Sequence, residues 1–279
     1  MKRSKFLTEN RVTLVGLAFW VVGFSACLGV GQPLGWVSTS PQLTELLFQL
    51  DLGDRIVGTS EQSNYPPAAK KIRRIGQLFD PNLEAILVSQ PTLVLWDGSS
   101  WNPKLESHLA SLGIPSLKIS LDSVEEVFKT SIQLVQKFKA GKKSDDLIRA
   151  EIEWDNLKKI NHRFSFLAFA WGDPPIVFGE NTFLFSFIEA IGGRGIVPSF
   201  WSKNYLKVSE EWLMAQKPDR VVYLKHDEAS ASFMTKQCEK WWPQQKVSCV
   251  GVSAEKFARA SLTPFLFLSE LKSSLEPAK

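Results

Sequence analysis

The sequence predicts an α/β protein of two similar lobes with mainly parallel sheets, joined by a long backbone helix. Three observations support this fold class. Short apolar strands alternate with helical stretches along the chain, one sequence unit occurs twice, and a long helical stretch separates its two copies. With 279 residues, the chain has the length of one large domain or of two lobes, and it can bury a sizeable core.

The first 27 residues are expected to be an export signal rather than part of the fold. Four basic residues precede an apolar run, Val12–Ala26, that is too short and poorly flanked for a transmembrane helix. Ser25-Ala26-Cys27 also looks like the end of a bacterial lipoprotein signal, in which Cys27 would be lipidated after cleavage. Ordinary cleavage nearby and an uncleaved anchor stay open. We therefore expect a protein of the periplasm, or one anchored to the membrane and facing the periplasm.

The basic character of the chain belongs to this segment. The whole chain carries a net charge of +4, and residues 1–27 contain four basic residues and one acidic residue, so the remainder is close to neutral. A nucleic-acid binder would need a basic stripe, and the rest of the chain shows none.

The N-terminal lobe is predicted to span residues 36–139. Its strands are short apolar runs, and helical periodicity precedes the later ones. We place these strands at 36–38, 55–58, 92–96 and 116–119, with a helix at 42–50.

Apolar residues then recur at helical spacing from Asp122 to Ile160, interrupted only at Ala140-Gly141, and we place the backbone helix at 142–161. A helical connector implies a stiff hinge and a small closing motion. The C-terminal lobe is predicted to span residues 162–279. Its strands are expected at 164–169, 176–178, 220–224 and 247–250, and its helices at 182–191, 210–216, 230–241 and from Pro264 onward.

The repeated unit covers residues 82–96 and 209–223. In each copy a glutamate, Glu84 or Glu211, lies two residues after a helix-capping residue, and a proline and a buried strand follow. A carboxylate in the first turn of a helix is favoured by about 0.3–1 kcal/mol whatever its function. The residues alone therefore permit a purely structural role, and Glu210 beside Glu211 leaves the matching position open.

Several motifs occur in the order found in one family: Trp36–Pro41, Thr44–Leu47, Asp54–Gly58, Tyr65–Pro67, Ile75-Gly76 and Asn82–Trp96. From about residue 36 to its end, the chain resembles the periplasmic cobalamin- and iron-siderophore-binding proteins of ABC importers. The stretch Phe257–Ser261 fits the cobalamin-binding members best.

This resemblance implies the helical-backbone periplasmic binding protein fold. It also implies a monomeric, non-enzymatic substrate-binding protein that captures cobalamin or a related corrinoid between its lobes. The protein would deliver this ligand to an ABC permease and its ATPase at the inner membrane, with Glu84 and Glu211 docking on arginines of the permease. A ferric siderophore or haem is the alternative ligand.

Ligand contacts are expected from loops at the carboxyl ends of the strands, where open α/β sheets bind their ligands. Aromatic faces there suit a flat chelate, although core packing remains the alternative for any single ring. Three features depart from the family: Leu78-Phe79 replaces a tryptophan of the cobalamin binders, Glu255 only approximates an acidic position, and Gly192-Gly193-Arg194-Gly195 lacks the asparagine often seen after that glycine pair. The predicted ligand-binding residues are Tyr65, Phe79, Trp96, Phe169, Trp171, Trp201, Tyr205, Glu255 and Phe257.

Other chemistries find little support in the sequence. The three histidines lie on unrelated segments, so no metal site is predicted, and we expect no cofactor other than the transported ligand. Bound haem would need an axial tyrosine or histidine, for which Tyr65, Tyr205, Tyr223 or His226 are the available residues. No nucleophile or phosphate-loop motif is recognisable, which leaves an exported enzyme as a distant alternative. A receptor that signals to a partner without feeding a transporter is a third.

Cys238 and Cys249 are an even pair in a chain expected to be exported, so a disulfide is possible. Sequence alone does not supply the Cα distance that a bridge requires. Two buried free thiols stay open as the alternative.

Overall fold

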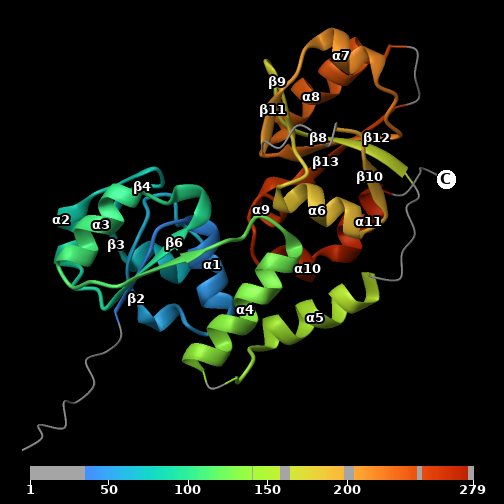
Figure 1. The fold of residues 1–279 in the computed structure, drawn as a ribbon. Coiled ribbons are helices and arrows are strands. Elements are labelled where there is room, and N and C mark those ends of the chain that lie inside the picture. The colour runs from blue at the N-terminus through green and yellow to red at the C-terminus, as the bar shows by residue number, and fades with distance from the viewer. Residues whose placement is uncertain (1–34, 140, 158–163, 198–203, 244–246, 276–279) are drawn as a thin grey trace, which may run out of the picture. The chain divides into compact units, whose positions relative to one another are not determined.

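Two β-sheets, one in each half of the chain, frame the protein (Figure 1). The structure is a computed structural model that describes residues 35–139, 141–157, 164–197, 204–243 and 247–275. The predicted export signal with Cys27 and the predicted ligand residue Trp201 lie outside these ranges. No helix within the described ranges has the length and apolar character needed to cross a membrane.

The sheet of the first half, here called the N-lobe sheet, is wholly parallel, in the order β3-β2-β1-β6-β7. A short antiparallel ribbon, β4 with β5, follows β3 along the chain. The strands are β1 (Trp36–Ser38), β2 (Ile56–Thr59), β3 (Arg73–Arg74), β4 (Gly76–Gln77), β5 (Asp80–Pro81), β6 (Leu93–Asp97) and β7 (Ser116–Ile119). The helices are α1 (Pro41–Gln49), α2 (Leu83–Val88) and α3 (Pro103–Ser111), with 3₁₀ turns at Gly53–Arg55, Pro67–Lys71 and Gly98–Ser100.

Helices cover both faces of this sheet, as a parallel sheet requires. Trp36 and Leu95 belong to the core cluster that contains the buried leucines of α1. Val94 and Trp96 belong to a second cluster with Ile86 of α2 and residues of α3. Because side chains alternate along a strand, neighbouring residues of β6 enter different clusters.

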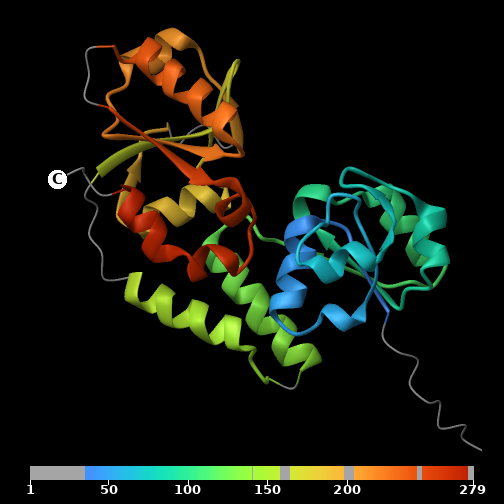
Figure 2. The ribbon, with the colours of Figure 1, turned by 180° about the vertical axis from the view of Figure 1, so that it is seen from behind.

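Two helices, α4 (Val124–Phe138) and α5 (Asp145–Leu157), connect the halves of the chain. Gly141 between them has a positive φ of 83°, a conformation that glycine adopts readily after a helix. The backbone N–H of Leu147 donates to the Ser144 hydroxyl at 3.3 Å, which caps the start of α5. The helix predicted at 142–161 therefore begins at Asp145. Figures 1 and 2 both show α5 running beside α10.

The sheet of the second half, here called the C-lobe sheet, is mixed, in the order β11-β9-β8-β12-β13, and β10 also pairs with β8. β8, β10, β12 and β13 are parallel, whereas β9 and β11 are antiparallel additions at one edge. The strands are β8 (Phe164–Gly172), β9 (Pro175–Phe178), β10 (Gly193–Gly195), β11 (Tyr205–Lys207), β12 (Arg220–Lys225) and β13 (Ser248–Ser253). The helices are α6 (Phe183–Ala190), α7 (Glu210–Ala215), α8 (Glu228–Trp241), α9 (Ala254–Phe257), α10 (Thr263–Leu266) and α11 (Leu268–Leu275).

Aromatic pairs fix the helices of the C-lobe to its sheet. The Phe166 ring lies 4.9 Å from that of Phe185 on α6, and the Phe169 ring stacks at 5.2 Å on Trp241 of α8. The three-residue spacing of Phe166 and Phe169 directs them to opposite faces. The α/β class with mainly parallel sheets, predicted from the sequence, is thereby confirmed.

The two cysteines of the C-lobe are bonded to each other. Cys238 on α8 and Cys249 on β13 have an S–S distance of 2.07 Å and a Cα–Cα distance of 6.6 Å. The sequence left open a disulfide or two free thiols, and the structure has the disulfide.

Candidate functional site

Buried hydroxyl groups occupy the carboxyl end of the N-lobe sheet, where β1, β2 and β6 stop. Thr44 on α1 lies 2.9 Å from the Ser38 hydroxyl and 2.6 Å from that of Thr59. The Ser40 hydroxyl donates to the carboxylate of Asp97 at 2.7 Å. A satisfied buried polar network of this kind is stiff. Sequence reasoning missed it, although the run Ser38-Thr39-Ser40 at the end of the first strand was its signal.

Tyr65 is an exposed aromatic residue of the N-lobe and part of the candidate site. It follows β2 in the chain, and 41% of it is exposed. The guanidinium carbon of Arg259, from the C-lobe, lies 5.9 Å from the centre of its ring. An aromatic face next to a cation presents both an apolar surface and a positive charge to a ligand.

Arg259 is held in this position by Glu45 of α1. An Arg259 Nη1 donates to the Glu45 carboxylate at 2.9 Å; the Glu45 side chain is 1% exposed and that of Arg259 28% exposed. The hydroxyls of Ser261, at 2.8 Å, and of Thr263 donate to the other Glu45 oxygen. Gln49, one turn further along α1, accepts from the Leu262 N–H at 2.8 Å. This network, here called the Glu45 cluster, binds α1 to the chain segment after α9.

Tyr205, the first residue of β11, is influenced electrostatically by two carboxylates of the N-lobe. Partial burial raises the pKa of the Tyr205 hydroxyl, and the negative charges of Asp122 and Asp97 raise it further. Burial also raises the pKa of Asp122, with a smaller opposite effect from the Ser120 hydroxyl that bonds it. Tyr205 is 57% exposed, and its ring packs at 5.4 Å on Phe178. The phenol is therefore neutral and available as a hydrogen-bond donor.

A cavity of about 370 Å³ lies where β8 and β12 end and α8 begins. Rings of Trp171 and Phe233 line it, and both are partly exposed, at 61% and 42%. His226 and Asp227 supply its polar groups, and Asp227 also caps α8. The buried Phe169 forms part of the wall. The cavity, here called the C-lobe cavity, can accept a flat apolar edge beside an imidazole.

Three predicted ligand residues are core residues in the structure: Trp96, Phe257 and Phe169, the last of which also lines the C-lobe cavity. Trp96 is fully buried in the cluster beneath α2 and α3, and its indole N–H donates to Ser116 at 3.2 Å. Strand alternation places it on the face of Val94, whereas Asp97, the next residue, reaches the polar end of the sheet. Phe257 is 1% exposed and packs on Phe187 of α6 at 6.4 Å. All three side chains are buried in the core, and their predicted ligand contact stays a prediction.

Of the other predicted ligand residues, Phe79 and Glu255 are exposed. Phe79, between β4 and β5, exposes 72% of its surface, the largest fraction among the exposed apolar residues of the described chain. Glu255 lies in the first turn of α9, the helix that leads to Arg259. Within the described ranges, the Glu255 carboxylate forms no hydrogen bond or ion pair.

The repeated unit forms a short capped helix in both lobes. Asn82 accepts from the Ala85 N–H at 2.8 Å to start α2, and Ser209 accepts from the Trp212 N–H at 3.2 Å to start α7. Glu84 and Glu211 are both exposed in the first turn. Glu210, in contrast, forms an ion pair of 2.6 Å with Lys240 of α8.

A hydrogen bond from the backbone N–H of Glu211, and a smaller one from the Ser209 hydroxyl, lower the pKa of the Glu211 carboxyl. Glu211 is therefore ionised at neutral pH. The geometry thus favours Glu211 over Glu210 as the counterpart of Glu84.

Within the described part of the chain, no group of three or more histidine, cysteine, aspartate or glutamate side chains is arranged to hold a metal ion. The glycines at 193 and 195 serve packing: a Cβ on Gly195 would lie 1.9 Å from the Phe185 ring. They allow β10 to pair with β8 above α6.

Comparison with known proteins places these features in context. The periplasmic binding protein family matches residues 37–239. A vitamin B12-binding protein of Yersinia pestis (strain Pestoides F) is 26% identical over 231 residues, covering 81% of this chain and 80% of that protein.

Solved structures show the same fold. A periplasmic heme-binding protein from Roseiflexus sp. RS-1 matches 87% of this chain and 98% of its own, with a TM-score of 0.71 at 20% identity. The match to the periplasmic vitamin B12-binding protein of Vibrio cholerae covers 87% of this chain and 96% of that protein, with a TM-score of 0.70 at 20% identity. A Staphylococcus aureus protein complexed with heme matches 88% of this chain and 100% of its own, with a TM-score of 0.70 at 20% identity.

Proposed function

Because this chain belongs to the periplasmic binding protein family, we propose that it captures cobalamin or a related corrinoid and delivers it to an ABC importer. The family consists of binding proteins, and the role proposed here is likewise binding without catalysis. The chain would act in the periplasm after export, as a monomer. The proposed capture step is the same for a diffusible periplasmic protein and for one anchored through a lipid on Cys27.

One observation carries the proposal: both lobes expose large aromatic side chains outside their cores. Tyr65 belongs to the N-lobe, and Trp171 and Tyr205 belong to the C-lobe. Large rings supply wide apolar contact with little side-chain entropy to lose, which suits the flat face of a corrin. The similarity to the Yersinia vitamin B12-binding protein supports the same ligand class.

Polar groups beside these rings would orient the ligand. Arg259 is partly exposed and firmly held by Glu45, so its charge is available to an anionic ligand group. The neutral phenol of Tyr205 can donate to an amide oxygen at the rim of a corrinoid.

Haem is the second candidate ligand, and the C-lobe cavity favours it. There His226 lies beside the rings of Trp171 and Phe233. A neutral imidazole is a common axial ligand of haem iron, and an apolar wall suits the porphyrin edge. Solved structures that share this fold include heme-binding proteins. A ferric siderophore is the remaining alternative of the same class.

Delivery would use the two capped helices of the repeated unit. Glu84 on α2 and Glu211 on α7 each present a carboxylate to solvent, which suits arginines on a membrane permease. The energy for release would come from the ATPase bound to that permease. A soluble binding protein that signals to another partner would not need both lobes to present the same charge.

The test is calorimetric titration of purified protein, residues 28–279, with cyanocobalamin, with haem and a ferric siderophore in parallel. Saturable one-to-one cobalamin binding, micromolar or tighter, supports the corrinoid assignment. Tyr65→Ala and Tyr205→Ala should each weaken it. Binding of haem instead, abolished by His226→Ala, would replace the corrinoid by haem. No binding of any of the three would refute the chelate class.

A further inference from the structure

A second cavity, of about 400 Å³, lies between the edge strand β7 and α4. β7 ends the N-lobe sheet, and four consecutive residues, Leu117 to Ser120, line the cavity on one side. Residues of α4 line the other side. None of the aromatic residues of the candidate ligand site takes part. A volume of this size falls within the range of about 300–1,000 Å³ that small-molecule sites occupy.

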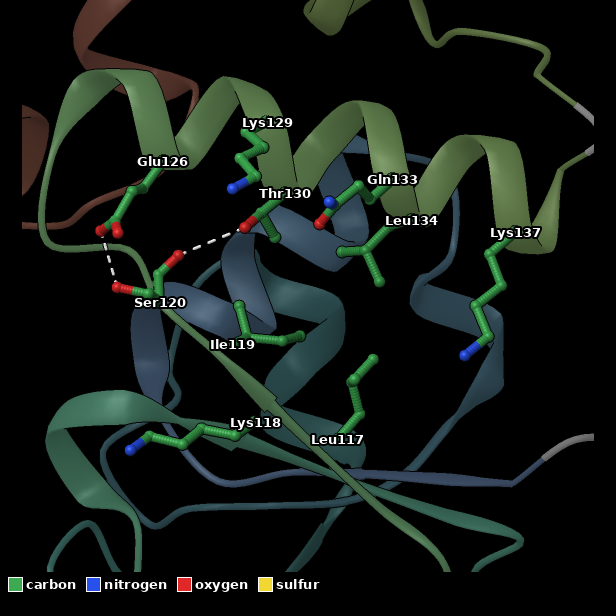
Figure 3. A pocket seen from close by; sticks show the side chains of 10 residues that line it. All are labelled: Leu117, Lys118, Ile119, Ser120, Glu126, Lys129, Thr130, Gln133, Leu134 and Lys137. Carbon is green, nitrogen blue, oxygen red and sulfur yellow. Dashed lines mark hydrogen bonds between the residues drawn. The ribbon is translucent and has the colours of Figure 1, made fainter.

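The middle of this cavity is apolar. Figure 3 shows Leu117 extending from β7 toward α4, and Leu134 extending from α4 toward β7. Ile119, which is almost fully buried, completes the floor between them. An apolar segment of a ligand would therefore pack mainly on Leu117, because Leu134 and Ile119 are only 3% and 4% exposed.

The two ends of the cavity are positively charged. Lys129 and Lys137 lie on the same side of α4, eight residues apart, and Figure 3 shows them at opposite ends of the cavity. At a rise of 1.5 Å per residue, their backbone positions are separated by about 12 Å. Lys118, on β7 across the cavity from α4, also lines it; its ammonium lies 4.0 Å from the ring centre of Trp101.

The one carboxylate that lines the cavity is engaged by other groups. Glu126 accepts from the Ser120 hydroxyl at 2.6 Å and from the Asp122 N–H at 3.1 Å. Lys129 and Lys137 form no ion pair with a carboxylate within the described ranges, unlike Lys139, directly after the end of α4, which pairs with Asp51 at 2.8 Å. Two ammonium groups thus face a shared cavity without a counter-charge.

We propose that this cavity binds an elongated organic dianion with an apolar middle, one anionic group meeting Lys129 and the other meeting Lys137. The spacing of the lysines along α4 sets the distance between the two anionic groups. The leucines and Ile119 select an apolar linker between them. A short dianion would reach only one end, and a monoanion would leave one end unpaired.

Titration calorimetry at low ionic strength tests this with decanedioate as the probe. Three comparison compounds separate the features: butanedioate has both charges without the length, decanoate has one charge, and 1,10-decanediol has none. We expect saturable one-to-one binding of decanedioate, with each comparison compound at least about tenfold weaker. The proposal is overturned if decanedioate shows no saturable binding, or if butanedioate or decanoate binds equally well.

A matched pair of double variants locates the site. K129Q/K137Q removes two charges from the cavity, and K104Q/K236Q removes two charges from exposed positions on α3 and α8. All four lysines are exposed, so neither variant disturbs a core. The affinity for decanedioate should fall about tenfold or more in the first variant and stay unchanged in the second. Equal binding by both would place the dianion elsewhere and overturn the assignment.

Discussion

Arg259 donates to the buried carboxylate of Glu45 at 2.9 Å, although the two residues are 214 positions apart in the chain. The contact joins α1 to the segment after α9, so it crosses from the N-lobe to the C-lobe. A buried carboxylate with three side-chain donors is costly to expose, because each donor would lose a charge-assisted hydrogen bond. The Glu45 cluster therefore acts with α4 and α5 to limit how far the lobes can move apart.

Glu45→Ala should lower the free energy of unfolding by about 2–3 kcal/mol, since three donors lose their acceptor at a largely buried site. The partial exposure of Arg259 keeps the loss below that of a fully buried pair. Glu151→Ala is the control, because its ion pair with Lys143 is partly exposed and contributes about 1 kcal/mol or less. Urea unfolding measures both. A loss no larger for Glu45→Ala than for the control would contradict the role of this cluster.

The disulfide between α8 and β13 should stabilise the C-lobe. It closes a loop of 11 residues in sequence separation, for which the chain-entropy argument gives about 2–3 kcal/mol. The Cys238→Ser/Cys249→Ser variant should lose about that much in thermal or urea unfolding. A reductant should destabilise the natural protein but leave the variant unaffected. If the reductant also destabilised the variant, its effect would not come from this bond.

Trp96 and Tyr65 should respond differently to truncation. Trp96→Ala removes a fully buried ring and should lower the free energy of unfolding by about 3–5 kcal/mol. Tyr65→Ala removes a ring that is 41% exposed, so it should weaken ligand binding while changing stability by about 1 kcal/mol or less. Urea unfolding and ligand titration on the same samples separate the two effects. If a Trp96→Ala variant stayed folded but lost ligand binding, this would support the ligand contact predicted for Trp96 from the sequence.

These residues show what the sequence could predict. Strand and helix periodicity depend on local spacing, so the alternation of elements, the two sheets and the capped helices at Asn82 and Ser209 were all predictable. The face on which Trp96 lies depends on where β6 ends, and one residue separates the core side from the ligand side. The Glu45 cluster was not predictable, because its partners meet only after both lobes have folded. Asp97 and Asp122 were missed for the same reason.

Reversing the charge of both exposed glutamates should block delivery without affecting capture. Glu84→Lys together with Glu211→Lys is expected to reduce uptake of the ligand by about tenfold or more, because each lobe would then repel the arginines on which these glutamates are proposed to dock. Ligand affinity should stay unchanged, since both side chains are exposed, and stability should fall slightly, because a positive charge is disfavoured in the first turn of a helix. Transport in reconstituted vesicles measures uptake, and calorimetry measures affinity.

Glu210→Lys is the matched control for the same helix. Glu210 already pairs with Lys240, so its reversal disturbs a contact within the C-lobe rather than a free carboxylate. It should reduce uptake less than Glu211→Lys does. Uptake that survives the double reversal intact would refute docking through these glutamates. A Glu210 effect larger than that of Glu211 would reassign the second docking residue.

The titration of Tyr205 should report on the carboxylates of the N-lobe. Partial burial, followed by the charges of Asp122 and Asp97, raises the pKa of this phenol above its ordinary value of about 10. A raised pKa means that folding favours the protonated form, so the stabilising effect is present below the ordinary pKa and is lost as pH rises through the folded value. Asp122→Asn removes one negative charge and should lower the pKa of Tyr205 while leaving it raised, because burial remains. The difference in tyrosinate absorbance between each protein and its Tyr205→Phe variant isolates this group from Tyr65 and Tyr223. A Tyr205 titration unaltered by Asp122→Asn would show that β11 does not face the N-lobe carboxylates in solution.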